Sequence, residues 1–152
     1  MNRVWTFIIS KSLSHNELSL LRESGNKFVT GWTAHEQKLT ASFEIFKSRI
    51  IIVKVNEDVT NASGCSIDKL TQFIKKLEVE FNIELLNRLL VAYENNAEIE
   101  VVHSSKIKEL IQINTINENT MVYNTSISIQ SELQNWQQAL KNTWLSKYLI
   151  PA

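Results

Sequence analysis

The segment SGCSID, residues 63–68, combines residue types that can do chemistry at the start of a helix. An apolar pattern of helical period begins at Ile67, so the preceding residues are predicted to form the helix N-terminus. Backbone amides there lack intrahelical acceptors, and the positive end of the helix dipole favours anions and thiolates. Gly64 permits a left-handed turn or a close approach of the backbone to a ligand. The segment therefore predicts an anion site, or a nucleophilic thiol at Cys65.

The same segment also has a purely structural interpretation. Ser66 would be the N-cap of the helix, Asp68 a first-turn carboxylate that the dipole favours, and Cys65 a small buried filler. The sequence alone leaves both interpretations open.

A second stretch, GWTAH at residues 31–35, places an indole close to an imidazole. An aromatic ring can bind a flat or cationic ligand, and histidine can act as a general base. If the fold brings His35 to Cys65, the two form a nucleophile pair; otherwise Trp32 belongs to the core and His35 to the surface. We therefore predict a catalytic pair of Cys65 and His35 for an enzyme. For a binding protein we predict a ligand site made by Trp32, Ser63, Gly64, Ser66 and Asp68.

Motifs for metals and nucleotides are missing from the sequence. The three histidines and Cys65 do not have the spacing of a metal site, so no metal is expected. Neither a P-loop nor the Rossmann glycine triplet is present, so no cofactor is expected either.

The charge balance bears on the partners. Lys plus Arg and Asp plus Glu each number 16, and a net charge of zero argues against a nucleic-acid partner. Residues 1–54 contain eight basic and four acidic side chains, which is consistent with a basic face that attracts a small anionic ligand. The single cysteine excludes an intrachain disulfide, and no apolar run reaches the roughly 20 residues of a membrane span. We expect a soluble, cytoplasmic protein.

Hydrophobic periodicity predicts the elements that must position these residues. Strands are expected at 3–9, 39–46, 49–55, 89–94, 98–103 and, more weakly, 120–129. Helices are expected from Ser14 to about Gly25, from Ile67 to Phe81, after Ser104 or Ser105, and over 131–149, with Pro151 beyond the last one. The β-branched run at 50–53 indicates a central strand buried on both faces.

This order of elements predicts a single α+β domain over residues 1–152, with helices packed on a mixed or antiparallel sheet. The first six elements follow the β-α-β-β-α-β order of the ferredoxin-like fold, and a β/α extension follows.

The stretches GWTAH (31–35) and ASGCSIDK (62–69), with SFEI (42–45) and RIIIVKV (49–55) between them, resemble a family of short bacterial proteins of unknown function. The likeness extends to LLVAYE and to the NTSI…NW…TW ending. Members are often labelled "ABC transporter ATPase". The sequence lacks a Walker A loop and an LSGGQ signature, so we do not expect ATPase activity. The resemblance implies no other activity.

Three functions remain open at this point. The first is a binding or regulatory domain whose ligand or protein partner meets the junction of residues 32–35 with residues 63–68. The second is a thiol-dependent enzyme with Cys65 as nucleophile and His35 as base. The third is a structural subunit that forms a homodimer through the last helix or an exposed strand.

Overall fold

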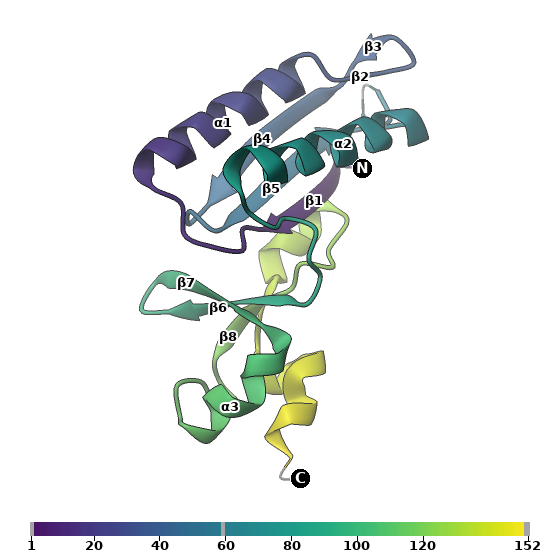
Figure 1. Cartoon of the computed structure of the whole chain (residues 1–152). Coiled ribbons are helices and arrows are strands. Elements are labelled where there is room, and N and C mark those ends of the chain that lie inside the picture. The colour runs from purple at the N-terminus through teal and green to yellow at the C-terminus, as the bar shows by residue number, and fades with distance from the viewer. Residues whose placement is uncertain (1, 59, 151–152) are drawn as a thin grey trace.

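Two antiparallel sheets stack between layers of helices in the computed structural model, which describes residues 2–58 and 60–150 (Figure 1). Along the molecule the layers are two long helices, a three-stranded sheet, a four-stranded sheet and a group of short helices. The α+β class is confirmed. Within the described ranges, no helix is both long and apolar enough to cross a membrane. Pro151, which we expected beyond a last helix, lies outside the described residues.

The central strand of the first sheet is the one that the β-branched run predicted. The strand order is β1 (Asn2–Ile8), β5 (Ile50–Asn56) and β4 (Thr40–Phe46), with both pairings antiparallel. Successive side chains of a strand point to opposite faces. Ile51 and Val53 therefore pack toward the long helices, and Ile50 and Ile52 pack toward the second sheet.

Two long helices, α1 (His15–Thr30) and α2 (Gly64–Phe81), cover one face of this sheet (Figure 1). The predicted capping box starts α1: the Ser14 hydroxyl accepts the Glu17 amide at 3.1 Å, and the Glu17 carboxylate accepts the Ser14 amide at 2.9 Å. A small hairpin of β2 (Thr33–Ala34) and β3 (Gln37–Lys38) connects α1 to β4.

In the second sheet, the two strands expected at 89–94 and 98–103 form a hairpin that turns at Asn96 and Ala97. The strand order of the sheet is β7 (Glu98–His103), β6 (Leu90–Asn95), β8 (Met121–Tyr123) and β9 (Gln137–Ala139). Five short helices accompany this sheet: η1 (Ser104–Lys106), α3 (Ile107–Gln112), η2 (Gln130–Asn135), η3 (Leu140–Asn142) and η4 (Trp144–Leu149). The short helix expected after Ser104 is thus confirmed.

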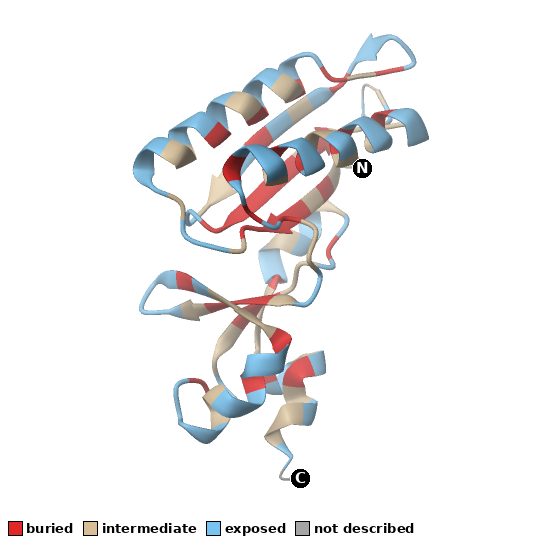
Figure 2. Cartoon of the chain, in the orientation of Figure 1, coloured by how far each residue is buried: buried red, intermediate tan, exposed pale blue. Residues whose placement is uncertain are grey.

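Three apolar clusters fill the spaces between the layers. In Figure 2 the buried residues are red. The first lies between the long helices and the first sheet and includes Leu21 and Ile74. The second lies between the two sheets and joins Ile52 to Trp136. The third, with Ile107, lies under the short helices. Because the second cluster contains residues of both sheets, the two halves form one domain.

The expected end of the first helix at Gly25 is wrong, since α1 continues to Thr30. Gly25 lies inside the helix, where a Cβ would overlap the ring of Phe43. The glycine therefore permits a close approach of α1 to β4 and does not end the helix.

Replacing Gly25 by Ala is expected to lower the free energy of unfolding by about 1–3 kcal/mol, because Phe43 must move to admit a methyl group. Urea denaturation measures the loss. Gly31→Ala is the matched control, because a Cβ at Gly31 meets nothing closer than 4.0 Å. Equal effects of the two substitutions would contradict the close approach.

The ferredoxin-like plan is followed for three strands only. The order β1-β5-β4 matches that plan, but β6, its expected fourth strand, pairs with β7 and β8 in the other sheet. The open edge of β1 instead meets a loop: the Val4 amide donates to the Ser128 carbonyl at 3.0 Å, and Arg3 forms a β-bridge with Ile129. The strand expected at 120–129 is formed in part: residues 121–123 make up β8, and Ile129 takes part in this bridge.

The expectation of one helix over residues 131–149 is also wrong. The segment forms η2, β9, η3 and η4 in succession. Trp136, Leu140 and Trp144 are spaced four apart and would share one face of a helix. In the structure Trp136 packs between the sheets, Leu140 packs under the short helices, and Trp144 is exposed. Packing into two different clusters outweighs the helical pattern of the sequence.

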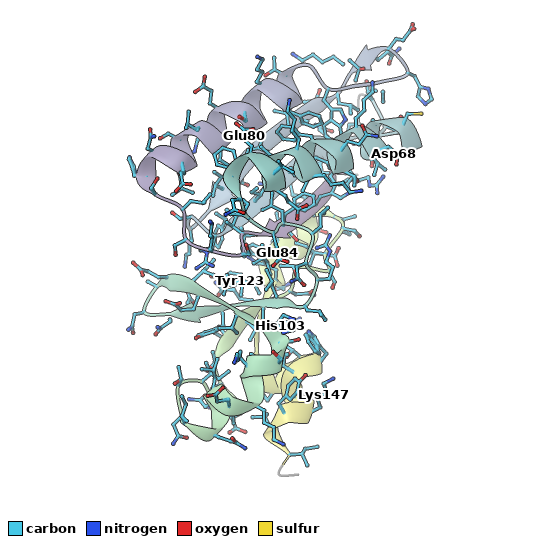
Figure 3. The ribbon with its side chains drawn as sticks, viewed as in Figure 1. Asp68, Glu80, Glu84, His103, Tyr123 and Lys147 are labelled. Carbon is cyan, nitrogen blue, oxygen red and sulfur yellow. The ribbon has the colours of Figure 1, made fainter. Side chains whose placement is uncertain are left out.

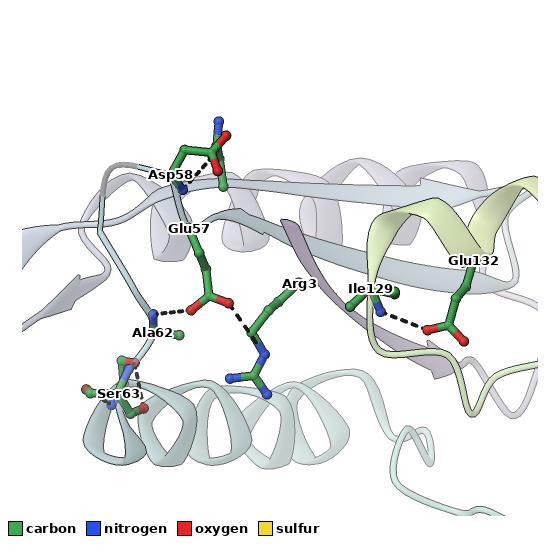
Figure 4. A network of polar contacts seen from close by, with 9 residues as sticks. Arg3, Glu57, Asp58, Ala62, Ser63, Ile129 and Glu132 are labelled. Carbon is green, nitrogen blue, oxygen red and sulfur yellow. Dashed lines mark hydrogen bonds and ion pairs between the residues drawn. The ribbon is translucent and has the colours of Figure 1, made fainter. Parts of the chain in front are cut away.

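Glu132 holds this loop in place on β1. Its carboxylate accepts the Ser128 amide at 2.9 Å and the Ile129 amide at 3.0 Å. Figure 4 shows the second of these hydrogen bonds. These backbone hydrogen bonds lower the pKa of Glu132 below its ordinary value.

A pKa that is lower in the folded state than in the unfolded state means that ionised Glu132 stabilises the fold above the unfolded value of about 4.3. This stabilisation is lost as the pH falls through the folded value. Glu132→Gln is therefore expected to reduce the loss of stability between about pH 5 and pH 3, measured by urea denaturation. The control is Glu80→Gln, because Glu80 is exposed on α2 (Figure 3). An unchanged pH profile for Glu132→Gln would contradict this role.

Candidate functional site

The two sequence stretches predicted to form a site meet at one corner of the molecule. The β2–β3 hairpin, the loop after β5 and the start of α2 lie together there, and β2 contacts α2 (Figure 1). Residues 31–35 and 63–68 are thus neighbours in space although about 30 positions separate them in the chain.

Two serines cap α2 reciprocally. The Ser63 hydroxyl accepts the Ser66 amide at 3.1 Å, and the Ser66 hydroxyl accepts the Ser63 amide at 2.7 Å (Figure 4). The N-cap is therefore Ser63, three residues before the serine that the structural interpretation proposed. Ser66 is 1% exposed and also donates its hydroxyl proton to the Ser63 carbonyl at 2.8 Å. Both hydroxyls are therefore engaged in starting the helix.

Gly64 and Cys65 in the first turn of α2 are exposed, and so is Asp68. Because the helix begins at Gly64, Asp68 lies beyond the first turn, and the first-turn carboxylate expected there is wrong. Asp68 lies near the N-terminal end of the helix (Figure 3). Gly64 has no heavy atom within 4 Å of a Cβ position and does not have a positive φ, so the left-handed turn expected there is wrong. Among the described residues, no hydrogen-bond acceptor meets the amides of Gly64 and Cys65. These two amides are available to an anionic group.

Trp32 lies at this corner but inside the core. It is 2% exposed, and its rings pack 5.9 Å from Trp5 and 5.3 Å from Phe28 between centroids. Its indole N–H donates to the Ser66 carbonyl at 2.9 Å. The expectation of an accessible aromatic plate is therefore corrected: the indole ties the chain before β2 to the first turn of α2, because a buried N–H needs an acceptor.

His35 is exposed at the tip of the β2–β3 hairpin. His35 and Glu36 form its two-residue turn with φ of 51° and 65°, the left-handed values of a type I′ turn. Although Cys65 and His35 both lie at this corner, no hydrogen bond joins the thiol to the imidazole, and both residues are described. The predicted catalytic pair is not assembled.

Glu57 is a site residue that the sequence did not reveal. One carboxylate oxygen accepts the Ala62 amide at 2.8 Å and the other lies 3.9 Å from the Arg3 guanidinium (Figure 4). The Asn56 side chain accepts the Asp58 amide at 2.9 Å, which turns the chain just after β5. Glu57 thus ties its loop to β1 and to the approach of α2. No local signal could reveal this, because Arg3 is 54 positions away in the chain.

A hollow of about 620 Å³ opens at this corner. Its wall on the hairpin includes His35 and Gln37, and its wall on the loop includes Glu57 and Asp58. Trp32 and Ser66 are buried and do not line the hollow. The lining is therefore polar and lacks the indole that the sequence predicted for the ligand site. Within residues 2–58 and 60–150, no group of three or more His, Cys, Asp or Glu side chains is placed to hold a metal ion.

Comparisons with known proteins give no identity for the chain. No protein-family model matches it, and no curated protein and no solved structure is significantly similar to it. The resemblance to the family of short bacterial proteins therefore stays a prediction.

The capping geometry predicts unequal effects for two neighbouring residues. Ser63→Ala removes the acceptor of the Ser66 amide and is expected to lower the free energy of unfolding by about 1 kcal/mol in urea denaturation. Cys65→Ala changes an exposed thiol and is expected to leave stability within about 0.5 kcal/mol. A larger loss from Cys65→Ala than from Ser63→Ala would contradict the structure of this helix start.

Proposed function

We propose that the protein is a non-enzymatic binding or regulatory domain that holds a small ligand, or a segment of a protein partner, in the hollow between the β2–β3 hairpin and the loop after β5. The supporting observation is the hollow itself, which has about 620 Å³ and polar residues on both walls.

Contacts with the rest of the fold hold both walls of this hollow in place, and this order favours binding. The hydrogen bond from Trp32 to Ser66 anchors the hairpin side, and the contacts of Glu57 with Ala62 and Arg3 anchor the loop side. A wall that is ordered before the ligand arrives loses little conformational entropy on binding.

The charges at the corner set the class of ligand. The free amides of Gly64 and Cys65 favour an anionic group at the helix start, as the sequence predicted. Inside the hollow, however, the carboxylates of Glu57 and Asp58 would repel an anion. A ligand that reaches both regions has an anionic group for the amides and hydrogen-bonding groups for wall residues such as His35, Gln37 and Asn61, as a free amino acid does.

Thermal denaturation with a panel of amino acids, amines, small anions and nucleotides tests this proposal. A ligand at 100 times its dissociation constant adds about 2.7 kcal/mol of stability. His35→Asn is expected to reduce the shift in melting temperature, because it removes an imidazole from the wall while Asn tolerates the left-handed turn. His15→Asn, at an exposed histidine on α1, is the matched control. The proposal is wrong if no compound raises the melting temperature, or if both variants respond alike.

The thiol-dependent enzyme remains a second candidate, because Cys65 is exposed beside two free amides. It requires His35 to reach Cys65, and no hydrogen bond joins them. The rate of iodoacetamide alkylation against pH decides between the two functions. A rate that has levelled off near pH 7 and falls in His35→Asn would favour the enzyme. A rate that still rises to about pH 8.5, as for an ordinary cysteine, would remove its support.

A further inference from the structure

A second cavity, of about 530 Å³, lies in the other half of the molecule beneath η3 and η4. It opens because β6 and β8 form one pair, Tyr93 with Val122, and then diverge. In a continued antiparallel ladder Val91 would face Asn124, but both line the cavity. The chain turns away from β6 at Asn124. The Asn124 side-chain oxygen accepts the Ser126 amide at 2.9 Å, and the Asn124 backbone amide donates to the Trp136 carbonyl.

An exposed indole stands at this cavity. Trp144 lines it and is 56% exposed, whereas the indoles of Trp32 and Trp136 are buried. Lys147 Nζ lies 5.4 Å from the Trp144 ring centroid, and the Tyr148 ring packs edge-on at 6.5 Å. The Thr143 hydroxyl accepts the Leu145 amide at 3.2 Å and fixes the backbone around Trp144. The indole is therefore held in place although much of its surface meets solvent, so part of the ring surface is open to a ligand in the cavity.

The polar groups of this cavity are neutral amides and hydroxyls. Gln138 and Asn142 line it from β9 and η3, and their side-chain amides form no hydrogen bond with other described residues. Each amide offers both a donor and an acceptor. Thr125 and Ser126 add hydroxyls, and the buried Leu145 adds apolar surface.

Charge is nearly missing from the lining. Arg88 is the charged residue there, and its guanidinium donates to the Thr6 carbonyl at 3.2 Å and lies 5.9 Å from the Phe7 ring centroid. Within the lining, a phosphorylated or strongly acidic ligand would therefore find one cation, which is already engaged; Lys147 lies outside the lining, beside the Trp144 ring. The lining favours a neutral ligand.

We infer that this cavity binds a neutral saccharide. A sugar ring has an apolar C–H face that packs against an exposed indole, and its hydroxyls each donate and accept one hydrogen bond. Those hydroxyls point outward around the whole ring. They therefore match the side-chain amides of Gln138 and Asn142 together with the hydroxyls of Thr125 and Ser126, which come from separate segments. A nucleobase has its polar groups on the edge of a plane and would leave part of this set without partners.

Nitrogen-15 NMR of the whole chain tests the inference. Neutral mono-, di- and trisaccharides are titrated, followed by nucleosides and free amino acids. The indole N–H resonance of Trp144 and the side-chain amide resonances of Gln138 and Asn142 are expected to shift with a saccharide. Trp144→Ala and Asn142→Ala are each expected to weaken binding by about tenfold or more. Ile113→Ala, which truncates another exposed apolar residue, is the matched control and should bind as the wild type does.

The inference is wrong if no saccharide shifts these resonances, if nucleosides or amino acids shift them and saccharides do not, or if Ile113→Ala weakens binding as much as Trp144→Ala. Binding in the hollow beside His35 is measured independently of binding in this cavity, because the two sites are far apart. Asp68 at the start of α2 and Lys147 on η4 lie at opposite ends of the molecule (Figure 3). Failure at one site therefore leaves the result at the other unaffected.

Discussion

The burial of β5 on both faces is the constraint on which the rest of the structure depends. Ile51 and Val53 complete the core beneath the long helices, and Ile50 and Ile52 complete the core between the sheets. Burying these side chains contributes on the order of 1.5–3 kcal/mol each. Because β5 contributes side chains to both cores, unfolding of either half of the molecule would expose apolar side chains of β5.

The same constraint explains where the two candidate sites lie. The Glu57 loop begins where β5 ends, so one wall of the first hollow extends directly from the most buried strand, while the β2–β3 hairpin forms the other. The second cavity lies where β6 and β8 diverge, and residues of both neighbouring apolar clusters line it: Tyr123 and Ile127 from the cluster between the sheets, Val91 and Leu145 from the cluster under the short helices. Both sites are thus placed at the margins of a rigid core, where irregular backbone and polar side chains can meet a ligand.

Local patterns in the sequence predicted much of this fold, and non-local packing explains what they missed. The Ser14 capping box, the period of α2 and the β-branched run of β5 are local signals, and each was confirmed. Gly25 has the same local signal as a helix end, and only the neighbouring Phe43 ring shows why it lies inside α1. Trp136 and Leu140 fit one helix face by spacing, but they pack into different clusters.

The sequence predicted that residues 32–35 and 63–68 meet, but not how they meet. Trp32 and Ser66 do meet, yet through a buried hydrogen bond that leaves neither side chain open to a ligand. The contact of Glu57 with Arg3 joins residues 54 positions apart, and the exposed Trp144 was expected on a helix that does not form.

Native-state hydrogen exchange tests the dependence on β5 most directly. Amides of β5, α2 and β6 are predicted to exchange with the same free energy, that of global unfolding, and the Trp32 indole proton is predicted to exchange with them. Exchange of the β6 amides at a clearly lower free energy than those of β5 would mean that the second sheet opens alone. That result would contradict the account of one strand shared by two cores.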